Sequence, residues 1–588
     1  MVRMTSPAAS ILQQRLTEQL GSVYHALTAV ELTQLVTELM TIAGISDLEE
    51  LPQPYTNHWD QRDAVVITYG DSILQSDHKP LTTLKNFLDR YLKNVINTVH
   101  ILPFYPFTSD DGFSVLDYSC VNESLGDWTD ITNIAEDYRL MADLVINHCS
   151  ARSRWFQNFL AGRNPGDDYF VVVDPTIDLS AVTRPRADPL LRPVDTASGI
   201  QHVWCTFSHD QVDLNFANPQ VLKQFVDIIK QYLDNGVRIF RLDAIAYLWK
   251  EIGTNCVNLD QTHTLVRVLR SLIECAQSNA VVVTETNIPN RENIAYFGNA
   301  NEAHWVYNFS LPPLLINTLL TGDCGYLKQW IMSMPPARAG TAYFNFIASH
   351  DGIGLRPAEG LLSDDEITRL IERMQSFGGR VSWRVQSDGS RKAYEINISL
   401  SDALQGSIEG SDHYGVPRFL CAHAVMLGLE GVPALYVHSL LGTRNDYQRL
   451  ENSGHNRAIN RHQWQLDELC NRLDQKTSHE AAIHDGLVRL LTIRSQQKAF
   501  HPNATQFTLH LGSQLFGYWR QSIDREQSIF CVSNIAKSTQ RLALSDLNLI
   551  DNQSWHDLIS GMDCSRRDMI LTMAPYQTVW ISNLIEPA

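Results

Sequence analysis

The sequence predicts an α/β protein whose main domain is a (β/α)8 barrel, a closed cylinder of eight parallel strands with helices outside. Eight short apolar runs rich in β-branched residues, typical of buried parallel strands, follow one another along the chain. Most gaps between them hold helix-like stretches such as "PLTTLKNFLDRYLKN". Polar residues directly follow several runs. The runs cover residues 64–69, 97–102, 140–147, 236–242, 280–286, 304–309, 342–348 and 432–437.

Segments outside this alternation divide the chain further. Residues 8–50 show helical periodicity, and the gaps after the third and seventh runs are too long for one helix. After "LVRLLTIRSQQKAF" alternating patterns such as "QSIFCVSNI" favour antiparallel strands. We therefore expect an N-terminal helical extension at 1–62, a barrel at 63–148, 218–351 and 416–500, loop-rich insertions at 149–217 and 352–415, and a β domain at 501–588.

Composition and charge exclude several classes of protein. The 588 residues are 44% hydrophobic and 19% charged, unlike a disordered chain. The net charge of −18 is spread along the sequence, which disfavours nucleic acid and anionic membranes as partners. The ten cysteines form no CxxC pair and no His-Cys metal pattern, and no apolar segment is long enough to span a membrane. We expect a cytoplasmic protein with reduced cysteines and no metal site.

Charged and polar residues stand at the ends of four predicted strands, which share one rim in a barrel. Each residue alone has an ordinary explanation. Arg241 and Asp243 can form a structural ion pair, and His148 can satisfy neighbouring backbone groups. Glu285 can be an exposed strand end. Their occurrence in order, each on its own strand end, favours a functional site containing Asp143, Asn147, His148, Arg241, Asp243, Glu285, His350 and Asp351.

Four segments around these residues resemble, in order and spacing, the four conserved regions of the α-amylase family, glycoside hydrolase family 13. They are "DLVINH", "VRIFRLDAIAY", "VVVTETNIPN" and "NFIASHDGIG". The resemblance covers nearly the whole chain from the first strand onward. It implies that Asp243 is the nucleophile, Glu285 the general acid and base, and Asp351 the transition-state stabiliser.

The residue types suit retaining chemistry at an anomeric carbon, which needs an ionised carboxylate and a protonated carboxyl about 5 Å apart. Arg241 precedes Asp243 by two residues and so lies on the same strand face, where it can keep the nucleophile ionised. Glu285 has no basic neighbour in sequence. Two nearby carboxylates would raise its pKa towards that of a useful acid.

Longer motifs resemble the sucrose-phosphorylase subgroup, whose members move glucose between a glucoside and phosphate. They are "LPFYPFTSDDGFSVLDY", "RPR", "FSHDQVDLN", "AYLWKEIGTNC" and "NSGHNRAINRH". The resemblance implies a double displacement through a β-glucosyl-enzyme, with inorganic phosphate as co-substrate and no cofactor. Arg186 would contact phosphate, unless it is a solvated loop charge. Phe113 and Phe207 would face the glucose, unless they are core residues. The other implied substrate-binding residues are Asp110, His148, Gln211, Arg241, His350 and Arg457.

The acceptor half of the site would be lined by Tyr247 and by the loop "RKAYEINIS". Sucrose phosphorylases have a Tyr-Gln pair where this chain has Tyr394 and Glu395, and the Glu form resembles relatives acting on glucosylglycerol or glucosylglycerate. A carboxylate accepts hydrogen bonds from a polyol, and it repels an anionic acceptor unless Arg391 or Lys392 offsets it. We therefore expect 2-O-α-glucosylglycerol as substrate, with glucosylglycerate, sucrose and sucrose 6'-phosphate as alternatives.

Two rival hypotheses follow from the same residues. A hydrolase or transglucosidase on the same barrel would release glucose or longer glucans at the same rate with and without phosphate. A catalytically silent sugar-binding protein would be expected to have lost at least one of the three catalytic carboxyls, and all three are present.

Overall fold

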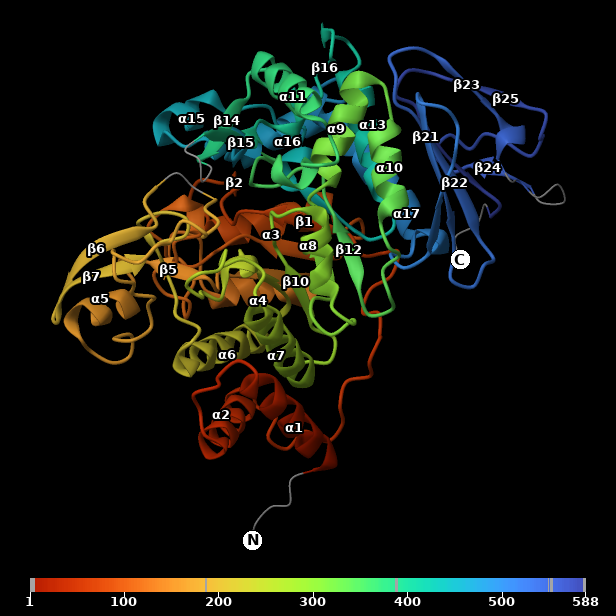
Figure 1. Ribbon diagram of the computed structural model, residues 1–588. Coiled ribbons are helices and arrows are strands. Elements are labelled where there is room, and N and C mark those ends of the chain that lie inside the picture. The colour runs from red at the N-terminus through yellow and green to blue at the C-terminus, as the bar shows by residue number, and fades with distance from the viewer. Residues whose placement is uncertain (1–5, 186–187, 386–389, 548, 550–553, 585–588) are drawn as a thin grey trace.

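The computed structural model describes residues 6–185, 188–385, 390–547, 549 and 554–584. Eight parallel strands close into a barrel (Figure 1), which confirms the fold class predicted from the sequence. Each strand overlaps one of the predicted runs. In order around the barrel they are β1 (Val65–Thr68), β18 (Val432–Tyr436), β12 (Ala342–Asn345), β11 (Trp305–Tyr307), β10 (Val281–Thr284), β9 (Val237–Leu242), β4 (Arg139–Leu144) and β3 (Thr98–Ile101).

The strands read as apolar runs because both of their faces are covered, one by the barrel interior and one by helices. Every residue of β1, β3, β10 and β12 is buried. The outer helices cover the sheet in different ways. The helix at 219–234 buries an apolar face, whereas the helix at 311–321 is buried almost all round. The outer helices are α3 (Pro80–Tyr91), α4 (Trp128–Asp137), α6 (Pro219–Asp234), α7 (Asp260–Ala276), α8 (Asn290–Ile294), α9 (Leu311–Thr321), α10 (Gly325–Ser333), α13 (Gly415–Gly428) and α17 (His479–Ser495).

Two N-terminal helices, α1 (Pro7–Gly21) and α2 (Ala29–Ile42), pack against α7 and α6 on the outside of the barrel (Figure 1). A capping box formed by Thr28 and Glu31 fixes the start of α2. The Tyr24 hydroxyl donates a 3.0 Å hydrogen bond to the carbonyl oxygen of Phe216, just before α6. The extension is therefore a helical hairpin attached to the barrel.

The segment between β4 and α6 returns to the barrel rim. β5 (His148–Ser150) pairs with β8 (Gln211–Asp213), which sets His148 opposite Asp213 and Ser150 opposite Gln211. The pairing brings together residues that are 63 positions apart, such as His148 and Gln211. The same segment contains α5 (Arg154–Ala161) and the hairpin of β6 (Leu191–Thr196) and β7 (Gly199–Trp204).

The segment after β12 forms a three-stranded sheet in the order β13–β15–β14. Gly354 pairs with Glu395, so a strand that begins just after Asp351 brings Glu395 to the rim. A Cβ on Gly352 would lie 2.4 Å from the carbonyl oxygen of Ile396, so only glycine fits there. The elements here are β13 (Ile353–Gly354), α11 (Asp364–Ser376), β14 (Arg380–Val385), β15 (Arg391–Asn397), α12 (Leu400–Ala403), β16 (Gly406–Ser407) and β17 (Gly410–Ser411).

Shorter elements complete the barrel rim between β18 and α17. β19 pairs with β2 in parallel, next to the start of α16. The elements are β2 (Ile73–Leu74), α14 (Val437–Leu440), α15 (Tyr447–Ser453), β19 (Trp464–Gln465) and α16 (Leu466–Asp474).

A C-terminal antiparallel sheet in the order β20–β21–β22–β26–β24 has its own apolar core around Phe530 and Trp555. Arg520 on β21 connects it to the barrel, because its guanidinium donates to the carbonyl oxygen of Gly428 at 2.6 Å. The strands of this sheet are β20 (Thr505–Thr508), β21 (Leu515–Gln521), β22 (Ser528–Asn534), β24 (His556–Asp557) and β26 (Thr578–Ser582). β23 (Gln540–Ala543) and β25 (Ile570–Met573) form a separate two-stranded sheet.

Membrane spans and metal clusters were sought in the described part of the chain. Within those ranges, no helix has the length and apolar character needed to cross a bilayer. The same residues contain no group of three His, Cys, Asp or Glu side chains placed to hold a metal ion.

Glu430, between α13 and β18, lies at the junction of the barrel with the C-terminal domain. Its carboxylate accepts a hydrogen bond from the N–H of Ala337 at 2.7 Å. Burial raises the pKa of this carboxyl to about 7. Between about pH 4.5 and 7 the folded protein therefore binds a proton that the unfolded chain lacks, so stability falls as pH rises through this window.

We expect Glu430→Gln to be more stable than the wild type at about pH 8, by up to about 3 kcal/mol, and to have no advantage at about pH 4. Denaturant unfolding at both pH values measures the difference. The exposed Glu372→Gln is the control and should show no such pH dependence. The same stability difference for Glu430→Gln at both pH values would contradict this account.

Candidate active site

Arg241 on β9 is the cation around which three carboxyl groups gather. Its side chain is 2% exposed. Nη1 donates to Asp243 at 2.7 Å and also to Asp143, and Nη2 lies 3.9 Å from Glu285. One guanidinium therefore contacts carboxyls from three neighbouring strands, β4, β9 and β10.

Asp143 holds Arg241 from the adjacent strand. The register of β4 and β9 sets the two residues side by side. His100 Nε2 lies 2.7 Å from the second carboxylate oxygen of Asp143, and both side chains are fully buried. Burial opposes ionisation, but Arg241 and His100 hold the pKa of Asp143 below its usual value. Asp143 therefore carries a fixed negative charge beside Arg241.

The chain turns sharply after Asp243, and this turn contacts Glu285. Ala244 has a φ of 49°, in the left-handed region that residues with a Cβ rarely occupy. Its N–H donates to Glu285 Oε2 at 3.0 Å. Glu285 directly follows β10, the neighbour of β9. The turn thus keeps the carboxyls of Asp243 and Glu285 close together.

Burial raises the pKa of both Asp243 and Glu285, and nearby carboxylates, including Asp351, raise them further. Arg241 opposes these shifts. Because Arg241 donates directly to Asp243 but stays 3.9 Å from Glu285, the contacts favour the charge on Asp243 and the proton on Glu285. This division suits a nucleophile beside a general acid.

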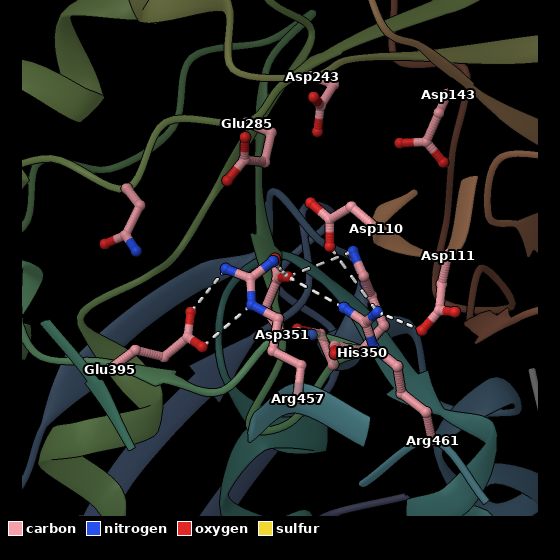
Figure 2. Close-up of polar contacts among 12 residues, drawn as sticks. Asp110, Asp111, Asp143, Asp243, Glu285, His350, Asp351, Glu395, Arg457 and Arg461 are labelled. Carbon is pink, nitrogen blue, oxygen red and sulfur yellow. Dashed lines mark hydrogen bonds and ion pairs between the residues drawn. The ribbon is translucent and has the colours of Figure 1, made fainter. Parts of the chain in front are cut away.

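Asp351 lies across the pocket from Asp243 and Glu285, among cationic side chains (Figure 2). Arg457 Nη1 lies 2.5 Å from Asp351 Oδ1, and Arg461 Nη2 lies 3.9 Å from it. Burial alone would raise the pKa of Asp351, but Arg457 and the other basic neighbours hold it well below its usual range. Asp351 is therefore an ionised group that can stabilise positive charge on a reacting sugar.

Arg457 also forms a bidentate ion pair with Glu395, in which Nε lies 3.1 Å from Oε1 and Nη2 lies 2.7 Å from Oε2. The Glu395 side chain is 1% exposed, so Arg457 supplies its counter-charge. Arg461 donates to Asp111 at 2.7 Å and to the carbonyl oxygen of His350 at 3.0 Å. The two arginines connect the loop after β3, the segment after β12 and β15 (Figure 2).

The opposite wall comes largely from the segment between β4 and α6. His148 Nε2 lies 2.9 Å from the carbonyl oxygen of Phe113, and the Gln211 side-chain amide donates to the same oxygen at 3.2 Å. The Phe207 ring packs between His148 and Tyr247, with centroid distances of 5.2 and 5.5 Å. Burial lowers the pKa of His148. Neutral polar groups and aromatic faces therefore form this wall.

These side chains surround one pocket. Arg241 lies beneath it, in contact with Asp243, and Glu395 lies behind Arg457. Arg186 falls outside the described residues. Asp143 and Asn147 do not line the pocket and contact Arg241 and Lys250 instead. The remaining site residues named from the sequence line it, namely Asp110, Phe113, His148, Phe207, Gln211, Asp243, Tyr247, Glu285, His350, Asp351, Tyr394 and Arg457.

Sequence reasoning did not single out Asn287, which also lines the pocket. Its Nδ2 donates to the Tyr394 hydroxyl at 3.3 Å, while its buried Oδ1 has no hydrogen-bond partner among the described residues. The signal that could have identified Asn287 was its position two residues after Glu285, within the segment "VVVTETNIPN". Arg461 was also missed, although it lies within the quoted motif "NSGHNRAINRH".

Comparisons with known proteins show the family to which the chain belongs. The alpha-amylase family, described as "Alpha amylase, catalytic domain", matches residues 69–351. The chain is 41% identical over 575 residues to the glucosylglycerate phosphorylase of Escherichia coli (strain K12), covering 97% of this chain and 100% of that protein. The chain belongs to the α-amylase family.

A further relative and a solved structure are also similar to this chain. The chain is 30% identical to the glucosylglycerol phosphorylase of Marinobacter adhaerens (strain DSM 23420 / HP15), over 74% of this chain and 87% of that protein. The crystal structure of sucrose 6F-phosphate phosphorylase from Thermoanaerobacter thermosaccharolyticum has the same fold, with a TM-score of 0.70 and 24% identity over 81% of this chain and 94% of that one. The chain is thus an enzyme of the phosphorylase type within the α-amylase family.

Proposed function

We propose that the enzyme catalyses the reversible phosphorolysis of α-glucosylglycerate to α-glucose 1-phosphate and glycerate, with retention at the anomeric carbon. The observation that carries this proposal is the 41% identity, over 97% of the chain, to a protein named as a glucosylglycerate phosphorylase. The glucosylglycerol phosphorylase is 30% identical over 74% of the chain.

The contacts of Glu395 support an anionic acceptor. The sequence favoured glucosylglycerol because an unbalanced carboxylate would repel glycerate. In the structure Arg457 balances Glu395 through two hydrogen bonds. Lys392 pairs with Glu359 at 3.1 Å instead. Because both oxygens of Glu395 are hydrogen-bonded to the Arg457 guanidinium, the repulsion expected between Glu395 and an acceptor carboxylate is reduced.

In the first step, Asp243 attacks C1 of the glucosyl group while Glu285 gives its proton to the oxygen that leaves with glycerate. The bond from C1 to the acceptor oxygen breaks, and an ester bond between C1 and Asp243 forms on the opposite face. Asp351 lies across the pocket, where its charge stabilises the positive charge that develops at C1.

In the second step, phosphate occupies the space that glycerate leaves. Glu285, now ionised, takes a proton from phosphate as a phosphate oxygen attacks C1 and the ester to Asp243 breaks. The two inversions give α-glucose 1-phosphate and restore the starting protonation states. Arg186 is the residue that the family resemblance assigns to phosphate. Neither step needs a metal or an organic cofactor.

The proposed glucose contacts use the remaining lining residues. Phe113 stacks on His350 with ring centroids 5.1 Å apart and planes 5° from parallel, which gives the sugar a flat apolar face. Phe207 and Tyr247 form the facing wall. The residues proposed to hydrogen-bond the glucose hydroxyls are Asp110, His148, Gln211 and Arg457, and those proposed to face the acceptor are Tyr247 and Tyr394.

The compartment is part of the same proposal. All ten cysteines are free thiols, and most are buried. Unpaired cysteines at this number are usual in a reducing compartment. We therefore place the enzyme in the cytoplasm, with the glucoside and phosphate as its small-molecule partners.

An acceptor panel tests the function. The enzyme is supplied with α-glucose 1-phosphate and either glycerate, glycerol, fructose or fructose 6-phosphate, and phosphate release is followed over time. We expect kcat/KM for glycerate to exceed that for glycerol by at least about tenfold. A higher kcat/KM for glycerol would instead indicate glucosylglycerol as the substrate. Glucoside cleavage that yields glucose at the same rate with and without phosphate would instead indicate a hydrolase or transglucosidase.

Glu395→Gln tests whether this carboxylate acts through Arg457 or touches the acceptor. Because Glu395 holds the Arg457 guanidinium from behind, its loss should weaken glucose binding whatever the acceptor is. We expect kcat/KM to fall about tenfold, by the same factor with glycerate and glycerol.

The matched control is Glu359→Gln, since Glu359 pairs with Arg384 and Lys392 in the same inserted segment and does not line the pocket. Its rates should stay near those of the wild type. A loss in Glu395→Gln that is confined to one acceptor would show direct contact and contradict this role.

A further inference from the structure

Lys250 lies behind the pocket wall and is not one of the residues that line the pocket. Its side chain is 6% exposed. The ammonium lies 2.6 Å from the carbonyl oxygen of Tyr247, 2.7 Å from Asn147 Oδ1 and 2.6 Å from Asp213 Oδ2. An ammonium has three N–H groups, so each of them has an acceptor.

The three acceptors come from three separate segments of the site. Asn147 follows β4, Asp213 ends β8, and Tyr247 ends the short helical turn η2 (Ile245–Tyr247) after β9. Each is a lining residue or stands within two residues of one. Tyr247 lines the pocket itself, while His148 follows Asn147 and Gln211 precedes Asp213 by two residues. Lys250 therefore joins the segments that carry one wall of the pocket.

Asp213 extends the same network to Phe207. Its side chain is fully buried, and it accepts hydrogen bonds from the N–H of Thr206 at 2.8 Å and the Thr206 hydroxyl at 2.6 Å. Thr206 directly precedes Phe207. A buried ion pair is costly to form, and removing one partner leaves an unpaired charge. Such a pair therefore contributes little to the free energy of unfolding, but it can hold the segments that it joins in fixed positions.

We propose that Lys250, together with Asp213, is a positioning pair that keeps this wall closed against water. The proposal rests on the phosphorolysis described above. The glucosyl-enzyme has two fates: phosphate gives glucose 1-phosphate, whereas water attacks C1, gives its proton to Glu285 and releases glucose and the Asp243 carboxylate. Loosening the wall formed by His148, Phe207, Gln211 and Tyr247 admits water and favours the second fate.

The test measures the ratio of glucose to glucose 1-phosphate. The donor is α-glucosyl fluoride with a fixed phosphate concentration, since this donor delivers the same glucosyl group whatever the natural acceptor is. Both products come from one intermediate, so their ratio does not depend on the folded fraction of a variant. The variants are Lys250→Met and the double variant Lys250→Met/Asp213→Asn, which leaves no unpaired charge.

We expect the ratio to rise at least about tenfold in the double variant. The control is Lys223→Met, which removes the 2.8 Å ion pair with Glu38 between α6 and α2, and should leave the ratio unchanged. If Lys250→Met alone fails to fold, the product ratio of the double variant tests the proposal. A double variant that is folded and less active, with the ratio of the wild type, would overturn the proposal. A wild type that makes no glucose 1-phosphate would instead refute the phosphorolysis.

Discussion

The buried guanidinium of Arg241 is the contact on which the rest of the active site depends. A cation at this depth is unfavourable unless anions neutralise it, and carboxyls from three adjacent strands do so. The parallel register sets Asp143 and Val283 directly beside Arg241, so Glu285, two residues after Val283, reaches the same charge. The closed barrel therefore fixes the spacing of these carboxyls before a sugar enters.

The environments of the carboxyls, rather than their residue types, separate their roles. Asp243 and Glu285 are buried together and share one strong counter-charge, which favours one proton between them. Asp351 lies in a second network with Arg457 and stays ionised. The same Arg457 is hydrogen-bonded to Glu395, so the two carboxylates share one guanidinium and Glu395 is not an unpaired anion.

Much of this arrangement could be predicted because it is local in sequence. Buried parallel strands are recognisable as apolar runs. Because the residues that follow such strands lie on one rim of a barrel, Asp243, Glu285 and Asp351 could be predicted to lie together. Contacts between segments that are distant in sequence could not be predicted from the sequence. Glu395 is balanced by Arg457, 62 residues away, rather than by Arg391 or Lys392. The pairing of β15 with β14 shifts register between Lys392 and Glu395, and Lys392 forms its ion pair with Glu359 instead.

The central claim is that Asp243 forms a covalent bond to the sugar. The direct measurement is to quench the enzyme with acid during turnover of a fluorinated glucosyl donor whose second step is slow, and then to locate the added mass by peptide mass spectrometry. The account predicts one added fluoroglucosyl unit, on Asp243. A fluoroglucosyl unit on another residue, or no adduct while a product of retained configuration accumulates, would contradict it.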